Sequence, residues 1–249
     1  MTEKFANEKE FLANYNVHDF DVPLCTVDMA IFTVEEGALK VLLVKRANYP
    51  KKGKWALPGG FIDLANDKDL AATAHRKLTE KTGVTSPYLE QVSTVGNKSR
   101  DPRGWSITVS YFALISAEGI ALETHESTEE VAWLPVDSVL EDYKLAFDHK
   151  DILSSCLQRL KSKVLYTSLP IHLLPDTFTL PELQSVYEII LGQSLQKKSF
   201  RKRILDAEII EETGEMKATG ASRPAQLYKA CEDHLAHVFP RTLEGVRTD

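Results

Sequence analysis

The sequence predicts an α+β layer fold over residues 21–164, followed by a smaller domain of two helices and a β-hairpin over residues 179–231. Three observations support this division. Strand-like apolar runs surround one amphipathic helix in the first region, and a second helix closes it. Residues 165–178 carry two prolines and no regular apolar period, which indicates a linker between domains. Beyond this linker, apolar side chains recur at helical spacing and a basic helix follows.

The first domain is expected to open with a β-hairpin. The runs CTVDMAIFTV and ALKVLLVKR, at residues 25–34 and 38–46, are typical of strands and flank a Glu-Glu-Gly turn at residues 35–37. The next segment, KWALPGGFID, predicts a short strand that runs into a Pro-Gly-Gly corner.

An amphipathic helix is expected at residues 67–82, with Gly83 as its cap. Three apolar side chains recur there at four-residue spacing: Leu70, Ala74 and Leu78. Strand-like segments then return as YLEQVSTVG, WSITVSYFALI and EVAWLPVD. A helix over residues 149–161 closes the domain, and residues 1–20 form a separate N-terminal arm.

The second domain opens with a capped helix. Thr179 and Glu182 form a capping box, and Gly192 ends the helix. One face of this helix is apolar: Leu183, Val186, Tyr187, Ile190 and Leu191. The basic segment KKSFRKRIL predicts a second helix, and EIIEETGEM and PAQLYKA predict two strands around Gly214 with the loop KATGASR. This order is typical of a winged helix-turn-helix, and residues 232–249 follow it as a polar tail.

Composition and charge exclude several classes of protein. The chain has 249 residues, three widely separated cysteines and a formal net charge of −6. An odd number of cysteines without metal-ligand spacing argues against a disulfide scaffold or zinc site and favours a reducing compartment. The N-terminus lacks the apolar core of a signal peptide, and the longest near-apolar stretch, residues 107–117, is shorter than the ~20 residues of a membrane helix. We therefore expect a cytoplasmic protein without membrane contact.

The segment GGFIDLANDKDLAATAHRKLTEKTGV, residues 59–84, resembles the Nudix box of the Nudix hydrolase family. In that family, glutamates that share one helix face hold the Mg²⁺ ion, which bridges a diphosphate and activates water. The positions that match the family pattern are Arg76, Leu78, Glu80, Gly83 and Val84. The other two positions of the glutamate triad are Lys77 and Lys81.

These two lysines predict that the site has lost hydrolysis. Lys77, Glu80 and Lys81 together carry a net charge of +1, which repels a divalent cation. The glutamate expected before the helix falls near Lys68, and the spacing from Gly60 is longer by about two residues. We therefore expect no catalytic residue, no metal ion and no cofactor, so that the chain is not an enzyme.

Alternatives stay open at this helix. Glu80 can be a metal ligand, a solvated residue or a partner for Arg76. Three nearby aspartates could supply substitute metal ligands: Asp63, Asp67 and Asp69.

Two further motifs predict a binding pocket for a diphosphate. The run RDPRGW at residues 100–105 holds two arginines, whose guanidinium donors match phosphate oxygens in pairs. Its Trp105 can stack on an adenine or pack in the core. In LAFDH, Phe147 can stack, and Asp148 can accept from a ribose hydroxyl or cap the next helix. The candidate ligand-binding residues are Arg46, Gly60, Phe61, Arg100, Asp101, Arg103, Trp105, Phe147 and Asp148.

The second helix of the C-terminal domain concentrates positive charge. Residues 197–203 hold five basic side chains, and Lys198, Arg201 and Lys202 share one helical face. Phe200 and Ile204 lie roughly opposite, where they can pack on the preceding helix. A basic run alone is usually a solvated face, but between a capped helix and a hairpin it suits a recognition helix in the major groove. The candidate DNA-binding residues are Lys197, Lys198, Ser199, Arg201, Lys202, Arg203, Lys217, Thr219 and Arg223.

Over roughly residues 11–230, the chain resembles the Nudix-related transcriptional regulators of NAD metabolism, the NrtR family. The segments that carry the resemblance are FLANY, LPGGFID, RKLTEKTG, VGNKSRDPRGWSITVSY, LAFDH, FTLPELQ, KSFRKR and RPAQLY. The resemblance implies a Nudix-type α/β/α sandwich followed by a C-terminal winged helix. It also implies a homodimer that binds a palindromic double-stranded DNA operator and is weakened by ADP-ribose. We therefore expect a repressor of NAD biosynthesis or salvage genes.

Two other functions remain open. A Mg²⁺-dependent ADP-ribose pyrophosphatase that also carries a winged helix is one, and Lys77 and Lys81 argue against it. A regulator of the same architecture that responds to a sugar such as arabinose is the other, and the Arg100 and Arg103 pair favours a diphosphate instead. Whether the regulator responds to ADP-ribose or to a sugar, the arm over residues 8–20 is expected to reach across the dimer.

Overall fold

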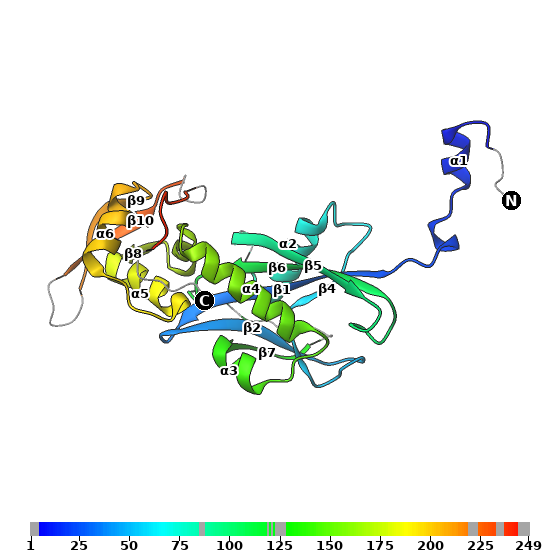
Figure 1. Ribbon diagram of the computed structural model, residues 1–249, viewed down its shortest axis with the longest axis horizontal. Coiled ribbons are helices and arrows are strands. Elements are labelled where there is room, and N and C mark those ends of the chain that lie inside the picture. Colours follow the sequence, from blue (N-terminus) through cyan, green and yellow to red (C-terminus); the bar gives the residue numbers. More distant parts are fainter. Residues whose placement is uncertain are drawn as a thin grey trace.

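The computed structural model describes residues 5–84, 88–118, 120, 122, 128–218, 224–232 and 237–243. Figure 1 shows a large domain built on a β-sheet, with a smaller domain of helices and strands at one end. A short helical arm at the N-terminus projects from the opposite end.

The large domain is centred on a seven-stranded mixed sheet. Its strands are β1 (Leu24–Glu35), β2 (Ala38–Arg46), β3 (Trp55–Ala56), β4 (Gly59–Phe61), β5 (Tyr88–Asn97), β6 (Ser106–Leu114) and β7 (Thr128–Pro135). The main path runs β3-β2-β1-β6-β5, with β4 paired to β1 and β7 paired to β2. Strands β1 and β6 are parallel, and the register places Thr26 beside both Phe61 and Thr108. The β3–β4 corner and the loop before β6 therefore meet at the same end of β1.

Helix α2 (Leu70–Thr82) covers one face of this sheet. Asp69 begins the helix by accepting a hydrogen bond from the backbone N–H of Ala72, and Gly83 ends it with a φ of +69°. The predicted four-residue spacing places Ala74 and Leu78 on the buried side of the helix. They share a core with side chains of β1 and β6: Val27, Met29, Ile31, Val109 and Tyr111.

Helix α4 (His149–Val164) covers the opposite face, and the shorter α3 (Val136–Asp142) packs into the same core. Because side chains alternate along a strand, Ala30 and Phe32 of β1 face α4. This arrangement confirms the predicted α/β/α sandwich. Helix α3 was not expected, since the segment EVAWLPVD reads as one strand; the chain instead leaves the sheet at Pro135, which lacks the N–H needed to continue the ladder.

The C-terminal domain contains two helices. Helix α5 (Leu180–Leu191) begins with the predicted capping box, in which Thr179 and Glu182 each bond to the backbone N–H of the other. Gly192 ends this helix with a φ of +69°. Helix α6 (Lys197–Asp206) is the predicted basic helix, and its buried Phe200 packs edge-on against Tyr187 of α5 at 5.1 Å between ring centres.

A three-stranded sheet completes this domain. The strands β8 (Thr177–Thr179), β9 (Ile210–Lys217) and β10 (Ala225–Ala230) pair in the order β8-β10-β9. Strand β8 was not expected, because its three residues carry no readable alternation. Gly214 lies inside β9, so that the chain turns only after this strand ends. The order of two helices and a hairpin confirms the predicted winged helix-turn-helix.

The segment predicted as a linker, residues 165–178, is folded and largely buried. A 3-10 helix, η2 (Leu169–Leu173), occupies its centre and buries Leu169, Ile171 and Leu173. The hydroxyl of Tyr187 in α5 donates a hydrogen bond of 2.7 Å to the backbone oxygen of Thr167. One apolar core therefore runs from β1 and α4 through η2 into α5 and α6. The two prolines and irregular apolar spacing reflect 3-10 geometry and not solvent exposure.

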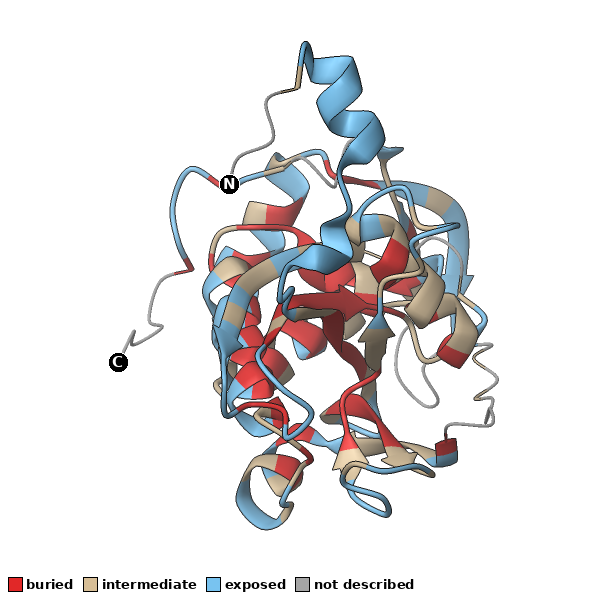
Figure 2. Ribbon diagram, turned by 90° about the vertical axis from the view of Figure 1, so that its right-hand side faces the viewer, coloured by how far each residue is buried: buried red, intermediate tan, exposed pale blue. Residues whose placement is uncertain are grey.

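The two ends of the chain differ in their packing. The arm holds α1 (Glu8–Asn14) and a 3-10 helix, η1 (Val17–Asp19), and Figure 2 shows it exposed along its length. The C-terminal tail, predicted to be polar, instead buries Phe239 and Leu243 in the core shared by both domains. In the described part of the chain, no helix combines the length and apolarity that crossing a membrane requires.

The change Tyr187→Phe tests the junction between the domains. It is expected to lower the free energy of unfolding by about 1 kcal/mol, because the buried oxygen of Thr167 loses its donor while the ring stays in place. Urea denaturation followed by circular dichroism measures the change. The matched control Tyr49→Phe, in the exposed loop between β2 and β3, leaves the free energy unchanged. Equal stability of Tyr187→Phe and wild type would contradict the contribution of this hydrogen bond.

Candidate functional site

A cavity of about 350 Å³ opens at the end of β1, between the β3–β4 corner, α2 and the start of α4. Seven of the nine predicted ligand-binding residues line it: Arg46, Gly60, Phe61, Arg100, Asp101, Arg103 and Phe147. Both lysines of the degenerate Nudix box, Lys77 and Lys81, also face it. Sequence reasoning missed further polar lining residues: Thr26, Asp28, Asn48, Thr128 and His149.

The Pro-Gly-Gly corner allows the cavity to form. A side chain at Gly59 would overlap the carboxylate of Asp28 and the backbone oxygen of Val27, so only glycine fits against β1 here. At Gly60 the backbone has a φ of +153°, and a Cβ would lie 3.2 Å from Cε of Lys77. The corner can therefore pass close beneath the lysine of α2 because neither glycine has a side chain.

The cavity is strongly cationic. Five permanently or normally positive side chains line it, against two carboxylates: Arg46, Lys77, Lys81, Arg100 and Arg103 against Asp28 and Asp101. Clefts lined by one sign of charge attract ligands of the opposite sign. The cavity is therefore suited to an anion such as a diphosphate.

The two arginines of the RDPRGW motif are already paired with carboxylates. Arg100 is buried and donates from Nε and Nη2 to the two carboxylate oxygens of Asp148, both at 2.9 Å, with Asp28 3.4 Å from Nη2. Arg103 donates to both oxygens of Asp101, with Nη2 at 2.7 Å from Oδ2, and this pairing lowers the pKa of Asp101. Its guanidinium also lies 5.0 Å from the centre of the Phe61 ring. Arg100 thus supports the wall of the cavity, while Arg103 forms part of its edge.

Arg46 differs from these two arginines. Its Nε donates to the backbone oxygen of Pro50 at 2.8 Å, and its guanidinium lies 5.0 Å from the centre of the Phe147 ring. It forms no salt bridge with any carboxylate that the structure describes. Burial lowers the pKa of Arg46, and the neighbouring charge of Arg103 lowers it further. An anion in the cavity would relieve this repulsion.

Asp28 and His149 form a buried polar pair behind the cavity. Asp28 accepts a hydrogen bond of 2.8 Å from the hydroxyl of Thr108, and its Oδ1 lies 3.7 Å from Nε2 of His149. Nδ1 of His149 accepts from the backbone N–H of Leu57 at 2.9 Å, and burial lowers the pKa of this imidazole. A charged residue within an otherwise apolar strand is the sequence signal that could have identified Asp28.

Two predicted ligand-binding residues do not line the cavity. Asp148 does not face it; this residue stands at the N-cap position of α4, but its carboxylate binds Arg100 and makes no cap hydrogen bond. Trp105 is half-exposed and lies in a separate groove with Phe20 and Pro23, so it is neither in the cavity nor in the core. Both belong to loops that border the cavity, but the direction of a side chain from a loop depends on contacts that spacing does not reveal.

The degenerate Nudix box does not fit a divalent cation. The carboxylate of Glu80 accepts hydrogen bonds from Nη1 of Arg76 and from Nζ of Lys77, each at 3.0 Å. Lys81 is buried and donates to the hydroxyl of Thr128 at 2.9 Å, and burial lowers its pKa. A cation at Glu80 would therefore meet two positive groups at contact distance.

The three aspartates considered as substitute metal ligands have other partners. Asp67 accepts from Nε of Arg76 at 2.8 Å and from the hydroxyl of Thr73 at 2.8 Å, and the pairing with Arg76 lowers its pKa. Asp63 accepts from Asn66, and Asp69 caps α2. Within the described ranges, no group of three or more His, Cys, Asp or Glu side chains is placed to hold a metal ion.

Helix α6 presents most of its predicted DNA-binding residues to solvent. The exposed ones are Lys197, Lys198, Ser199, Arg201 and Lys202, and Phe200 and Ile204 are buried on the other side as predicted. Arg203 is turned inward: its Nη2 donates to the backbone oxygen of Leu165 at 3.2 Å, and its guanidinium lies 4.0 Å from the centre of the Phe239 ring. Lys217 binds Oε1 of Glu182 at 2.7 Å. Thr219 and Arg223 lie outside the described residues.

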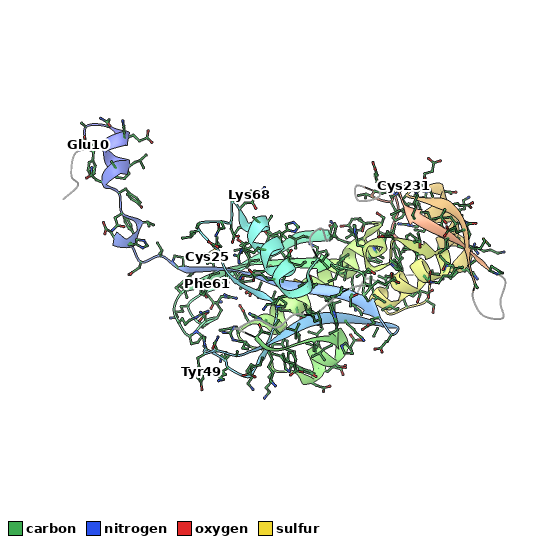
Figure 3. All side chains as sticks on the ribbon, turned by 180° about the vertical axis from the view of Figure 1, so that it is seen from behind. Glu10, Cys25, Tyr49, Phe61, Lys68 and Cys231 are labelled. Atoms are coloured by element: carbon green, nitrogen blue, oxygen red, sulfur yellow. The ribbon has the colours of Figure 1, made fainter. Side chains whose placement is uncertain are left out.

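The cavity and the basic helix lie far apart in the molecule. Figure 3 shows Phe61, at the rim of the cavity, near the end that carries the arm, whereas Cys231, directly after β10, lies in the winged-helix domain at the other end. Helix α4 begins beside the cavity at His149 and ends at Val164, next to that domain.

Known proteins resemble both parts of the chain. A family model described as a NUDIX domain matches residues 25–156, and one described as the NrtR DNA-binding winged helix domain matches residues 170–230. The ADPR responsive transcriptional repressor NtrR of Acinetobacter baylyi is 52% identical over 243 residues, which cover 98% of this chain and 96% of the relative.

Solved structures of one relative share the fold. NrtR of Shewanella oneidensis complexed with a 27mer DNA is 47% identical, with a TM-score of 0.82 over 88% of this chain and 99% of that chain. The NUDIX domain of the same protein complexed with ADP ribose is 49% identical, with a TM-score of 0.58 over 62% of this chain and 99% of that chain. This chain therefore belongs to the NrtR family, in which a Nudix domain precedes a DNA-binding winged helix.

Proposed function

We propose that this chain is a transcriptional repressor that holds operator DNA through its winged helix and releases it when ADP-ribose fills the Nudix cavity. The observation that carries the proposal is the presence, in one chain, of a cationic cavity and an exposed basic helix joined by a continuous core. Support comes from the Acinetobacter relative, which is named an ADPR responsive transcriptional repressor. The Shewanella structures, one with DNA and one with ADP ribose, support the same two ligands here.

The cavity suits the diphosphate of ADP-ribose better than a neutral sugar. Its lining holds five positive side chains, and guanidinium and ammonium donors form strong hydrogen bonds to phosphate oxygens. Of the arginines, Arg46 would stabilise a bound anion most directly, because the structure describes no carboxylate partner for it, whereas Arg103 lies at the rim and pairs with Asp101. Phe147 and Phe61, which these arginines contact, offer aromatic faces for a base or a ribose.

We further propose that the cavity binds ADP-ribose without cleaving it. In Nudix hydrolases the box carboxylates concentrate Mg²⁺; here Lys77 and Lys81 bring positive charge to the same helix face directly. These lysines can neutralise the diphosphate, but they cannot activate water as a metal ion does. A ligand that persists while bound acts as a signal, and the pyrophosphatase alternative requires a metal that these contacts do not favour.

The DNA contacts are proposed for the exposed side of α6. Lys198 and Lys202 lie at the centre of that side, opposite the buried Phe200 and Ile204, and Arg201 flanks them. This division orients the basic side of the helix toward a major groove. Arg203 is left out of this set because it packs inward.

We also propose a homodimer in the cytoplasm that controls genes of NAD metabolism. Ring contacts of 5.4, 5.4 and 5.6 Å join Phe5, Phe11, Tyr15 and Phe20 into a row along the arm, and the last three are exposed. Apolar surface gathered in this way is typical of a protein interface. An arm that leaves the body of its own subunit can cover this row only on another molecule, and a two-fold dimer matches a palindromic operator.

Fluorescence polarisation tests the central proposal. The protein is titrated into a labelled palindromic fragment from upstream of an NAD-salvage gene, at fixed salt, with and without ADP-ribose. We expect tight binding that ADP-ribose weakens, and chromatography recovers the nucleotide intact with Mg²⁺ present. Consumption of ADP-ribose together with a failure to bind the fragment would establish the pyrophosphatase alternative. Weakening by arabinose and not by ADP-ribose would establish the sugar-responsive one.

The change Arg46→Gln tests the cavity. Removing one charged donor is expected to raise the Kd for ADP-ribose roughly 10- to 150-fold, because a hydrogen bond to a charged group contributes about 1.5–3 kcal/mol. Isothermal titration calorimetry measures this constant. Lys54→Gln removes an equal charge from the exposed loop between β2 and β3 and serves as the control. If both variants bind ADP-ribose with the wild-type Kd, the diphosphate does not lie against Arg46.

The paired changes Phe11→Ser and Tyr15→Ser test the arm. They are expected to raise the dimer dissociation constant by at least about 100-fold, since each large apolar side chain contributes about 1.5–3 kcal/mol when buried and two are lost per subunit. Sedimentation equilibrium measures the constant. Glu8→Ser with Lys9→Ser alters the same helix without touching the aromatic row and should leave the dimer intact. An unchanged constant in the aromatic variant would place the dimer interface elsewhere.

A further inference from the structure

The C-terminal tail contains a segment, residues 237–243, that crosses the junction between the two domains; we call it the strap. The strap lies beyond residues 25–156 and 170–230, which the two family models match. Its Phe239 and Leu243 are buried in the shared core. Backbone hydrogen bonds join Phe239 N to Tyr166 O at 2.8 Å and Leu243 N to Leu165 O at 2.9 Å. The strap is therefore fixed to the end of α4 at two points.

The strap is also bound to the recognition helix. Arg203 of α6 places its guanidinium 4.0 Å from the centre of the Phe239 ring and donates to the backbone oxygen of Leu165 at 3.2 Å. The same oxygen accepts from the backbone N–H of Leu243. One backbone oxygen thus ties α4, α6 and the strap together, which holds the strap beside α6.

Between the strap and α6 lies a groove of about 520 Å³. Three positive side chains line it, Lys202, Arg203 and Arg241, against the single carboxylate of Asp206. Ser199 of α6 adds a hydroxyl group. Arg241 is exposed, and the structure describes no salt bridge for its side chain. Phe239 and Leu243, two residues before and after it, are buried, so the backbone of this arginine is held in place.

We propose that the strap is a second DNA-contacting element, in which Arg241 binds a backbone phosphate of the operator beside α6. This inference rests on the proposed function, since it requires α6 to face DNA. Lys202 belongs both to the exposed side of α6 and to the groove, so a duplex against α6 brings its backbone to Arg241. A guanidinium pairs with phosphate oxygens, and Ser199 supplies a further donor of the kind that phosphate contacts use.

A phosphate contact has a signature that a base contact lacks. It carries no sequence information, so its loss weakens operator and unrelated duplex by the same factor. It also releases condensed counterions, which lowers the slope of log affinity against log salt by about 0.9 for each phosphate. When both subunits of a dimer lose Arg241, two phosphate contacts are lost, and the slope should become less steep by about two.

The test compares Arg241→Ala, Arg241→Lys and wild type by fluorescence polarisation across a range of salt concentrations, on the operator fragment and on a scrambled duplex. We expect Arg241→Ala to bind both duplexes roughly ten-fold more weakly near ~150 mM salt with the reduced slope, and Arg241→Lys to restore most of the slope. Lys150→Ala removes an equal charge from the far end of α4 and should bind as wild type does. Thermal unfolding and ADP-ribose binding of Arg241→Ala should equal those of wild type.

The double change Arg201→Ala with Lys202→Ala separates this inference from the function on which it rests. Suppose that the double variant binds DNA weakly, while Arg241→Ala binds with the affinity and salt slope of wild type. This result would overturn the strap contact and leave the role of α6 standing. If the double variant binds DNA as wild type does, the proposed role of α6 as the recognition helix is itself overturned. A loss in Arg241→Ala that is confined to the operator, or that comes with a lower unfolding temperature and an unchanged slope, would also overturn a phosphate contact.

Discussion

The packing of α4 is the constraint on which the rest of the molecule depends. At its start, Asp148 binds Arg100 and His149 binds the β3–β4 corner, so the first turn of this helix is part of the cavity wall. At its end, the backbone oxygen of Leu165 accepts from both Arg203 and Leu243. Between these ends, α4 lies in one close-packed core that also contains α5 and α6. Because such cores do not deform continuously, a displacement of α4 at the cavity would be carried to α6. A ligand affects DNA binding only if its affinity differs between the conformations that can and cannot bind DNA.

The sequence predicted the elements whose periodicity is long enough to read. Helices α2, α5 and α6 and the long strands follow from apolar spacing and caps, since one buried face repeats several times in each. Helix α3 and strand β8 escaped prediction because they are short and because Pro135 and Thr179 each serve two neighbouring elements at once. The buried linker escaped for another reason: a 3-10 helix buries side chains without the period of an α-helix. The tail escaped because its apolar residues, Phe239 and Leu243 among them, are scattered without the period of a helix or a strand.

The sequence predicted most of the residues that line the cavity, but it did not predict which of their charges pair with each other. Loops that converge on one end of β1 could be identified from their motifs, and seven of nine candidates do line the cavity. Which cation meets which carboxylate depends on distances across the fold, between residues such as Arg100 and Asp148 that are 48 positions apart. Arg203 shows the same limit on a single helix. It lies within a run of basic residues, yet Phe239 and Leu165 on the other side of the core determine where its charge points.

These pairings change the explanation of why the cavity is positive. Arg100 and Arg103 were the predicted phosphate ligands, but Arg100 pairs with Asp148 and Arg103 pairs with Asp101, so these two ion pairs add little net charge. Positive charge without a described carboxylate partner comes from Arg46 and Lys81. Lys77 pairs with Glu80, and both lysines occupy positions of the glutamate triad. Replacing a glutamate by a lysine changes the local charge by two units without altering the helix or the corner beneath it. In the proposed function, the same two lysines therefore argue against a metal ion and add positive charge that an anion would meet. The charge of the cavity can differ while the fold stays intact, because the fold depends on the apolar side of α2 and the two lysines line the cavity from its other side.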